Sequence, residues 1–326
     1  MIENKFNALS RFAYSVRRPM RAAVSLALLV CATTAWAQPP AAGGIAVIYP
    51  DIGEPYRSVF GQIIGGIEDK SRGRVVSFPI GANPNPGELN ESLRRQGLKV
   101  AIALGRQGMK AASLLDRDID VVVGGVLAVQ EGEARNMQVN ILSPDPALLF
   151  SRLKELMPRV SKVFVVYDPR HSEWMVRLAK SAARSQGLEL EAFEAQDLRS
   201  AMRVYQDILA SSDHRQNALW LPQDPTTVEE SAVLPMVLQD SWARGLAVFS
   251  SNPGHVKRGA LFSLYPDNVE LGRRLADSAQ SMLASGEVSS MRPLRAVRIS
   301  VNLRTAKHLG IDAGRTQGFD MVFPEQ

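Results

Sequence analysis

The sequence predicts an α/β fold with mostly parallel sheets, on three observations. First, short runs rich in Val, Ile and Leu alternate along the chain with segments of helical periodicity, the order expected of a doubly wound sheet. Second, most of these runs are apolar throughout, which is typical of strands covered on both faces. Third, ten such runs are many for one open sheet. We therefore expect two doubly wound, Rossmann-like lobes with about five strands each.

The expected strands cover residues 45–49, 75–80, 100–104, 121–126, 163–167, 188–193, 218–221, 246–249, 261–265 and 297–301. The expected helices cover residues 56–70, 87–96, 107–115, 146–157, 173–186, 198–210, 228–244 and 268–285. Thr227 with Glu230 has the spacing of a capping box, as does Asp267 with Glu270. Gly187 and Gly245 follow helical runs, where a left-handed residue ends a helix. The prolines of segments 143–146 and 265–267 favour these places for the passage between lobes.

The N-terminal residues 1–37 have the pattern of a signal peptide. Three arginines precede an apolar run over residues 22–31, and Ala35-Trp36-Ala37 offers a small-x-small site for cleavage after Ala37. The run is shorter than the roughly 20 residues that span a bilayer. We therefore expect an exported protein that works in the periplasm, with residues 38–44 as a disordered lead-in.

Three alternatives stay open for this segment. Met20 is a possible true start, which would leave a compact signal peptide. Arg17-Arg18 resembles a twin-arginine signal, although the usual apolar pair does not follow. Cys31 is a possible lipidation site, although Val30 before it is bulkier than such sites usually accept.

Charge and cysteine content exclude several classes of function. The chain holds 38 Lys and Arg and 33 Asp and Glu; residues 1–37 hold five and one of these, which leaves 33 and 32. The mature chain is thus nearly neutral and gives no support for nucleic-acid binding, which needs a clustered basic face. The one cysteine of the whole sequence lies in the expected signal peptide. The mature chain would then have none, which excludes disulfides and thiolate sites. We expect a monomer.

Motifs of catalysis and of cofactor binding are missing from the sequence. It has no G-x-S-x-G elbow, no H-E-x-x-H and no phosphate-binding loop. Gly61, Gly65 and Gly66 lie inside a helical pattern, where we expect them to allow close packing of that helix on a sheet. The four histidines are scattered, so we expect no metal site, no cofactor and no enzymatic activity.

The candidate binding residues are positional. Ligands of open α/β sheets bind beyond the carboxyl ends of the strands, and polar or aromatic residues follow several expected strands. Arg106 could bind a carboxylate through two parallel hydrogen bonds, Asp224 could bind an ammonium group, and the neutral side chains could donate or accept. The candidates are Tyr49, Asp51, Arg106 and Gln107 in the first lobe and Tyr167, Asp168, Gln223, Asp224, Ser250, Ser251 and Asn252 in the second.

Each candidate also has a purely structural interpretation. Asp224 could cap a helix after Pro225, and Asp168 before Pro169 could form a turn. Arg106 could be solvated, and residues 250–252 could form a plain loop. The tryptophans lie in or beside apolar patterns and are expected in the core, with Trp174 as the one plausible stacking face.

From residue 150 onward the sequence resembles a known family. The matching pieces are residues 153–158 (Leu-Lys-Glu-Leu-Met-Pro), 163–167 with Pro169, the x-x-D-x-T loop within 221–227, Phe249-Ser250, residues 257–261, residues 265–276 and, most specific, residues 301–311 (Val-Asn-Leu-Arg-Thr-Ala-Lys-His-Leu-Gly-Ile). They resemble the ABC-transporter substrate-binding family that includes tryptophan- and tyrosine-binding members.

This resemblance implies a type I periplasmic binding protein: two lobes joined by a multi-strand hinge that close over a ligand. It implies a first lobe of residues 45–143 plus 266–285 and a second lobe of residues 144–265 plus 286–326. Asp224 and Ser250 are the best matched ligand-side positions. The first lobe departs from the family pattern, because Arg106 stands where a hydroxyl is usual and Gly124-Gly125 replaces an Asp-Pro segment.

The expected function is capture of a small polar or aromatic, amino-acid-like solute and its presentation to an ABC permease. The closed form would be recognised by this membrane partner. One alternative is a sensory or accessory binding protein that signals to a membrane sensor. A second alternative is a hydrolase or transferase on an α/β scaffold, although no set of nucleophile and base is visible in the sequence.

Overall fold

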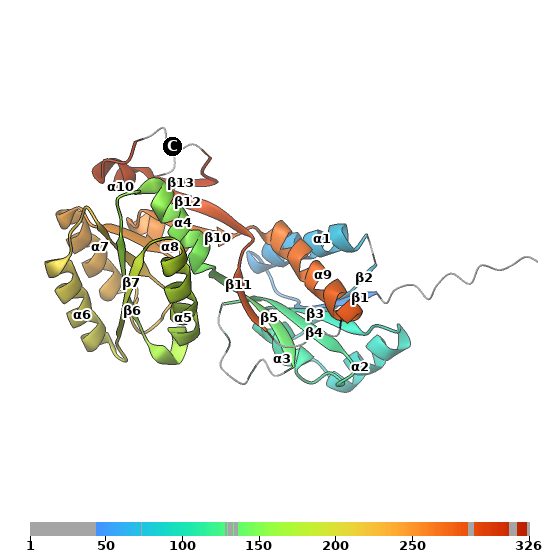
Figure 1. The fold of residues 1–326 in the computed structure, drawn as a ribbon. Helices are drawn as coiled ribbons and strands as arrows, with labels where there is room; N and C mark the ends of the chain where they lie inside the picture. Colours follow the sequence, from blue (N-terminus) through green and yellow to red (C-terminus); the bar gives the residue numbers. More distant parts are fainter. Residues whose placement is uncertain are drawn as a thin grey trace, which may run out of the picture. The chain divides into compact units, whose positions relative to one another are not determined.

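The computed structural model describes residues 44–72, 74–127, 129, 133, 136–285, 290–312 and 318–324 (Figure 1). The expected signal peptide, its cleavage site and Cys31 lie outside these residues, as does the lead-in except Gly44. Within the described part, the strands form two sheets.

The first sheet has six strands in the order β11-β5-β4-β3-β1-β2, and all its neighbours pair in parallel. Its strands are β1 (Ile45–Pro50), β2 (Val75–Ile80), β3 (Val100–Leu104), β4 (Asp120–Val126), β5 (Met137–Pro144) and β11 (Met291–Leu294). The helices that accompany it are α1 (Tyr56–Ser71), α2 (Pro86–Arg95), α3 (Gly105–Ala112) and α9 (Asn268–Ser285).

The second sheet has seven strands in the order β13-β12-β10-β9-β8-β6-β7, with β10 and β12 antiparallel. Its strands are β6 (Lys162–Tyr167), β7 (Glu189–Glu194), β8 (Asn217–Leu221), β9 (Ala247–Ser250), β10 (Phe262–Pro266), β12 (Val297–Asn302) and β13 (Met321–Phe323). Its helices are α4 (Pro146–Leu156), α5 (Pro169–Ser185), α6 (Leu198–Ser211), α7 (Val233–Arg244), α8 (Pro253–Arg258) and α10 (Leu303–His308). The predicted α/β class with two mostly parallel sheets is therefore confirmed.

The structure corrects several expected elements. β5, β11, β13, α8 and α10 were not anticipated, because they are short or carry polar side chains among the apolar ones. The capping box of Thr227 and Glu230 is wrong: α7 begins at Val233, and the Glu229 carboxylate accepts from the backbone N–H of Ala232 instead. Gly187 and Gly245 do adopt left-handed conformations, as expected after α5 and α7.

Close packing of α1 involves another helix, not the expected sheet. A Cβ atom on Gly66 would lie 2.0 Å from the carbonyl oxygen of Val269 in α9, and one on Gly272 would lie 2.0 Å from that of Ile63 in α1. A Cβ atom on Gly61 or Gly65 would meet nothing within 4 Å. The two helices therefore touch backbone to backbone at Gly66 and Gly272, and only there do these glycines have a packing role.

The chain passes between the sheets at three places: after β5, after β10 and between β11 and β12. The first two coincide with the proline segments singled out in the sequence. The third lies a few residues after the expected boundary between residues 285 and 286, because β11 pairs with β5 in the first sheet. The three passages are hydrogen-bonded, since Asp145 N–H donates to Leu294 O and Asp267 N–H donates to Ala296 O, both at 2.9 Å.

Candidate functional site

The carboxyl edges of the two sheets are where this topology places a ligand site. Strand order reverses between β1 and β3 in the first sheet and between β6 and β8 in the second. At such a switch point the loops diverge to opposite faces and leave a crevice. The sequence-predicted candidates follow β1, β3, β6, β8 and β9, and so they belong to these two edges.

Two glycines shape the edge of the first sheet. Gly105 after β3 has φ +70° and Gly125 at the end of β4 has φ +74°, a region that L side chains rarely adopt. A Cβ atom on Gly125 would lie 3.3 Å from Gly105 N, and one on Gly105 would lie 3.1 Å from the ring of Phe60. Gly125, which belongs to the Gly124-Gly125 departure from the family pattern, thus allows a close approach of two strand ends beside Phe60 of α1.

Accessible side chains of this edge include both aromatic and charged groups. Tyr49 is half-buried at the end of β1, and Arg106 and Gln107 are exposed in the first turn of α3. The guanidinium of Arg106 is 3.3 Å from the Glu133 carboxylate, and 62% of its side chain is exposed. Tyr56 and Leu127 are exposed to 60% and 58%.

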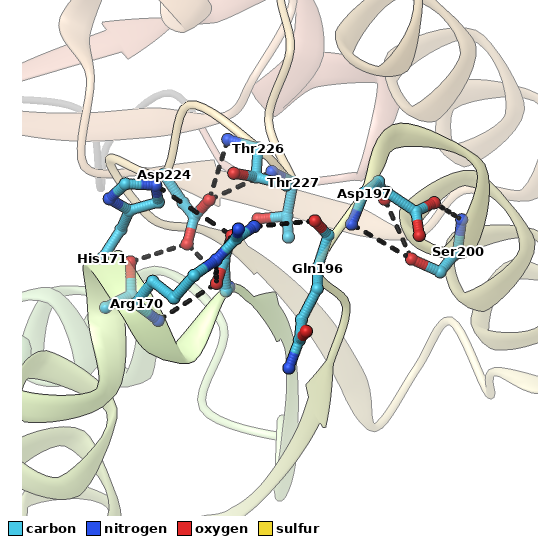
Figure 2. A network of polar contacts seen from close by, with 10 residues as sticks. Arg170, His171, Gln196, Asp197, Ser200, Asp224, Thr226 and Thr227 are labelled. Atoms are coloured by element: carbon cyan, nitrogen blue, oxygen red, sulfur yellow. Dashed lines mark hydrogen bonds and ion pairs between the residues drawn. The ribbon is translucent and has the colours of Figure 1, made fainter.

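Asp224 is the centre of a polar network at the switch point of the second sheet (Figure 2). Its Oδ2 accepts from the backbone N–H of Asp168 at 2.8 Å and from the Ser172 hydroxyl at 2.7 Å. Its Oδ1 accepts from the backbone N–H groups of Thr226 and Thr227, both at 3.0 Å. A carboxylate has about four acceptor positions, so an ammonium group would have to displace one of these donors.

The capping interpretation of Asp224 is therefore the one that these contacts bear out, although they cap a single turn and not α7. Thr227 completes the arrangement, because its hydroxyl donates to Val166 O of β6 at 3.0 Å. Residues at the ends of β6 and β8 are thus held together by side chains of the loop after β8.

Asp168, beside this network, also caps a helix, and its carboxylate forms an ion pair. Its carboxylate is fully buried and caps α5 by accepting from the backbone N–H of Arg170. The Arg170 side chain donates Nε and Nη2 to the same carboxylate and Nη2 also to Gln196 O at 2.7 Å (Figure 2). Hydrogen bonding from the Arg170 side chain, opposed by burial, lowers the pKa of Asp168 to about 2. The group is ionised at neutral pH, and 60% of the Arg170 side chain is exposed.

Tyr167, the last residue of β6, is buried and points its hydroxyl at two acids. The hydroxyl is 3.1 Å from Glu173 Oε2 and 3.2 Å from Glu194 Oε1. Burial, followed by the hydrogen bond to Glu173, raises the pKa of Tyr167 well above its usual value. Tyr167 is therefore a neutral donor held within the second sheet's edge.

The edge after β9 is organised around a buried histidine. The Ser250 hydroxyl is 2.8 Å from His255 Nδ1 and 3.2 Å from Leu221 O, and it accepts from the N–H of Asn252 at 3.0 Å. Asn252 Nδ2 is 3.2 Å from His255 Nε2. The neutral Nδ1–H tautomer fits these partners, since Nε2 then accepts from Asn252. Burial lowers the pKa of His255 to about 4, with Glu230 acting in the opposite direction.

One contact joins the two carboxyl edges directly. Ser143 Oγ at the end of β5 lies 2.8 Å from Gln223 Oε1 after β8, and Gln223 Nε2 donates to Ser251 O at 3.0 Å. Ser251 Oγ in turn accepts from the indole N–H of the fully buried Trp220 at 2.9 Å. Ser143 and Gln223 therefore lie where residues of both sheets meet.

Neither a metal site nor a membrane span is found in the described part of the chain. Its His, Cys, Asp and Glu residues form no group of three or more that could hold a metal ion. Of its helices, none has both the length and the apolar character needed to cross a bilayer.

Comparison with known proteins identifies the family. A sequence profile described as ABC transporter substrate binding protein matches residues 149–315, just over half of the chain. The chain belongs to this family. No curated protein matches the sequence. The family consists of solute-binding proteins and is not a class of enzymes, and it implies a small-molecule ligand and an ABC transporter as partner.

Several solved structures are similar to this chain. A ligand-free, open substrate-binding protein with adhesive properties from Clostridium difficile is 16% identical, with a TM-score of 0.60 over 87% of this chain and 100% of that one. An ABC domain in complex with L-Trp from Streptococcus pneumoniae is 15% identical, with a TM-score of 0.48 over 86% and 100%. A conserved domain protein from Vibrio cholerae is 18% identical, with a TM-score of 0.49 over 86% and 99%. The fold is that of type I periplasmic binding proteins.

For this substrate-binding protein, the structure divides the predicted site residues into two groups. Exposed or half-buried at the edges are Tyr49, Asp51, Arg106, Gln107, Gln223 and Asn252. Tyr167, Asp168, Asp224, Ser250 and Ser251 are buried, with their polar side-chain atoms bonded inside the chain. Trp174 is half-buried and packs against the main core.

Several residues at the edges of this substrate-binding protein were not predicted from the sequence. Arg170 and Ser172 stand two and four residues after Asp168, and this spacing in the first turn of a helix was the available signal. Phe60 and Ser143 gave no signal, because their roles depend on contacts with Gly105 and Gln223 that are distant in sequence.

Proposed function

We propose that this protein captures a small, amino-acid-like solute between the carboxyl edges of its two lobes and delivers it to an ABC importer. The observation that carries the proposal is the composition of the first edge. There, Tyr56 and Leu127 expose apolar surface in the same edge as the guanidinium of Arg106. An apolar surface with one arginine, whose ion pair with Glu133 a solute carboxylate would replace, suits a solute that has an apolar or aromatic body and a carboxylate.

In this proposal the exposed candidates contact the solute and the buried ones position the loops. Arg106 binds the carboxylate through parallel hydrogen bonds, and Tyr49 of β1 and Gln107 of α3 belong to the same edge. From the second lobe, Asn252 and Gln223 supply neutral hydrogen-bonding groups. Asp224 and Ser250, the family-matched positions, act as positioning residues, because their oxygens already bond to the loops that they hold.

The lobes of this proposal follow the sheets. The first comprises residues 45–143 and 266–285, with β11 added to it, and the second comprises residues 144–265 and the chain from β12 onward. The three hydrogen-bonded passages act as the hinge. A solute that binds better to the closed arrangement shifts the population toward it, and closure completes the surface that the permease recognises.

The setting of this function is the periplasm, to which a signal peptide of residues 1–37 would direct a monomeric protein. Support comes from the basic and apolar pattern of the N-terminal segment and from the family, whose members are typically extracytoplasmic.

A thermal-shift screen tests solute capture. Protein purified from the extracytoplasmic fraction is screened with amino acids and small aromatic acids, and hits are confirmed by calorimetry. A ligand at 100 times its Kd adds about 2.7 kcal/mol to the free energy of unfolding. If none of these compounds raises the melting temperature, the proposed solute class is wrong.

Uptake measurements test the transport role. Deletion of the gene should abolish high-affinity uptake of the identified solute, and expression of the chain should restore it. Unchanged uptake combined with a lost transcriptional response to the solute would favour the sensory alternative.

A further inference from the structure

A cavity of about 440 Å³ lies at the β11 side of the first sheet, where the passages between the sheets meet. Its walls come from β5, β11, α5, α9 and the segment between β11 and β12. None of the candidate residues of the carboxyl edges lines it. The polar and charged groups that matter for binding there are Asn140, Asp145, Arg274, Ser278, Arg292 and Arg295.

The cavity carries an excess of positive charge. Arg274, Arg292 and Arg295 line it, against the carboxylates of Asp145 and Asp277. The Asp277 carboxylate is also engaged outside, since Lys70 Nζ is 2.9 Å from its Oδ1. Asp145 pairs with Arg295, Glu270 with Arg274 and Asp277 with Lys70. Among the described residues the remaining positive charge of this cavity is therefore that of Arg292, and it favours uptake of an anion.

The three arginines differ in how far they are neutralised. Arg295 Nη1 donates to Asp145 Oδ2 at 2.8 Å, and Arg274 Nε is 3.3 Å from Glu270 Oε1. Arg292 Nε donates to the hydroxyl of Ser290 at 3.2 Å, which is a neutral partner. Among the described residues, no carboxylate within 4.0 Å of the Arg292 guanidinium is found.

Both carboxylate oxygens of the buried acid in this cavity already accept hydrogen bonds. Asp145 is 5% exposed, its Oδ1 accepts from Ala147 N–H at the start of α4, and its Oδ2 accepts from Arg295. It therefore fixes Arg295 in place without neutralising Arg292. The wall also holds the Ser278 hydroxyl and the Asn140 amide, whose Nδ2 has one long hydrogen bond, 3.4 Å, to Val123 O. Planar guanidinium groups with neutral donors are the set that binds tetrahedral or planar oxyanions.

We propose that this cavity binds a small free oxyanion such as inorganic phosphate, which bridges Arg292 of β11 and Arg295 of the following passage. The same passage supplies the carbonyls of Leu294 and Ala296, which accept from Asp145 N–H and Asp267 N–H of the other two passages. A bound oxyanion therefore stiffens the point where all three passages join. This site is separate from the proposed solute site and does not depend on the identity of the solute.

Calorimetry with inorganic phosphate tests the binding step. The full-length exported protein is titrated with phosphate, with chloride at equal ionic strength as the reference. We expect saturable phosphate binding that weakens at least 10-fold in Arg292→Gln and in Arg295→Gln. The matched control is Arg95→Gln, because Arg95 is an exposed arginine of α2 whose ion pair within the described part of the chain is a long contact of 3.9 Å to Glu91; it should leave phosphate binding unchanged.

Arg295→Gln also frees the buried Asp145 and can destabilise the fold, so Arg292→Gln is the decisive variant. No saturable binding beyond chloride overturns the proposal. Binding that is the same in Arg292→Gln overturns it as well. Competition between phosphate and a solute identified in the thermal-shift screen would place the anion at the solute site and would also overturn it.

Hydrogen exchange tests the stiffening. Saturating phosphate should slow exchange of the Asp145 and Asp267 amides several-fold, because their acceptors lie in the bridged passage. The effect should vanish in Arg292→Gln and persist in Arg95→Gln. Phosphate binding with unchanged exchange at both amides would refute the stiffening.

Discussion

The Oδ2 atom of Asp224 lies 2.8 Å from the backbone nitrogen of Asp168 and accepts its hydrogen bond. These residues follow β8 and β6, the neighbouring strands at the switch point of the second sheet. The bond therefore fixes the spacing of two loops that a ligand would meet. Loops that are fixed before a ligand binds lower the entropy cost of ordering them on binding.

Asp224→Asn should destabilise the protein by about 2–4 kcal/mol. Each carboxylate oxygen accepts two donors, so either orientation of the amide directs an NH₂ group at two N–H or O–H donors. Urea unfolding gives the change in the free energy of unfolding.

Asp118→Asn is the matched control. Asp118 is exposed, and among the described residues its ion pair is with Lys99 on the surface, so we expect little change in the free energy of unfolding. Equal losses in the two variants would contradict the structural role of Asp224.

Gly66→Ala and Gly65→Ala should have effects of opposite sign, although the two residues are adjacent in α1. A Cβ atom at residue 66 would lie 2.0 Å from Val269 O, so the helices must separate, at a cost of about 3 kcal/mol or more. A Cβ atom at residue 65 meets nothing within 4 Å; there, alanine should stabilise the helix by about 0.5–1 kcal/mol. Thermal unfolding of the two variants compares them directly, and a stable Gly66→Ala protein would refute the backbone contact of α1 and α9.

His255 should make stability fall as the pH drops from about 6.5 to about 4. Its pKa is near 6.5 in the unfolded chain and is lowered to about 4 in the folded one by burial. Between these values the unfolded chain binds more protons, so the free energy of unfolding rises with pH. The full contribution is present above pH 6.5, and the loss is complete below pH 4.

His255→Gln should remove this slope, which approaches about 1.4 kcal/mol per pH unit for one proton. Urea unfolding at several pH values measures it. The exposed His308, which stacks on Trp242 of α7, provides the control: His308→Gln should retain the slope. An unchanged slope in His255→Gln would assign the pH dependence to other groups.

The strands that could be predicted from the sequence were those whose own side chains are apolar throughout, such as β3 and β4. β5 was not predicted because Gln138, Asn140 and Ser143 interrupt its apolar residues. β11 was not predicted because it has only four residues, which form a strand by pairing with β5. β5 and β11 thus form strands because of pairing partners elsewhere in the chain, which the local sequence pattern does not reveal.

The candidate site was predicted by position but not by role. The rule that ligands bind beyond strand ends located Tyr167, Asp224 and Ser250 correctly at the edge of the second sheet. It could not tell that two of the four donors to Asp224 come from residues 52 and 56 positions earlier. A polar residue after a strand has the same sequence signature whether it faces a ligand or another loop, and only the fold separates the two cases.

Arg106→Ala should discriminate between charged and neutral ligands. Arg106 stands where the family usually has a hydroxyl, and most of its side chain is exposed at the first edge. A charge-assisted hydrogen bond contributes about 1.5–3 kcal/mol, so an amino acid that binds should lose roughly 10- to 100-fold in affinity. Its carboxamide has no charge to pair and should lose less than about 3-fold. Calorimetric titration of both compounds measures the two losses.

Lys110→Ala, in the last turn of the same helix, should leave both affinities unchanged, because Lys110 lies away from the strand ends. Equal losses for acid and amide in Arg106→Ala would exclude Arg106 from carboxylate recognition, since only a charge-selective loss separates a direct contact from a general disturbance of α3.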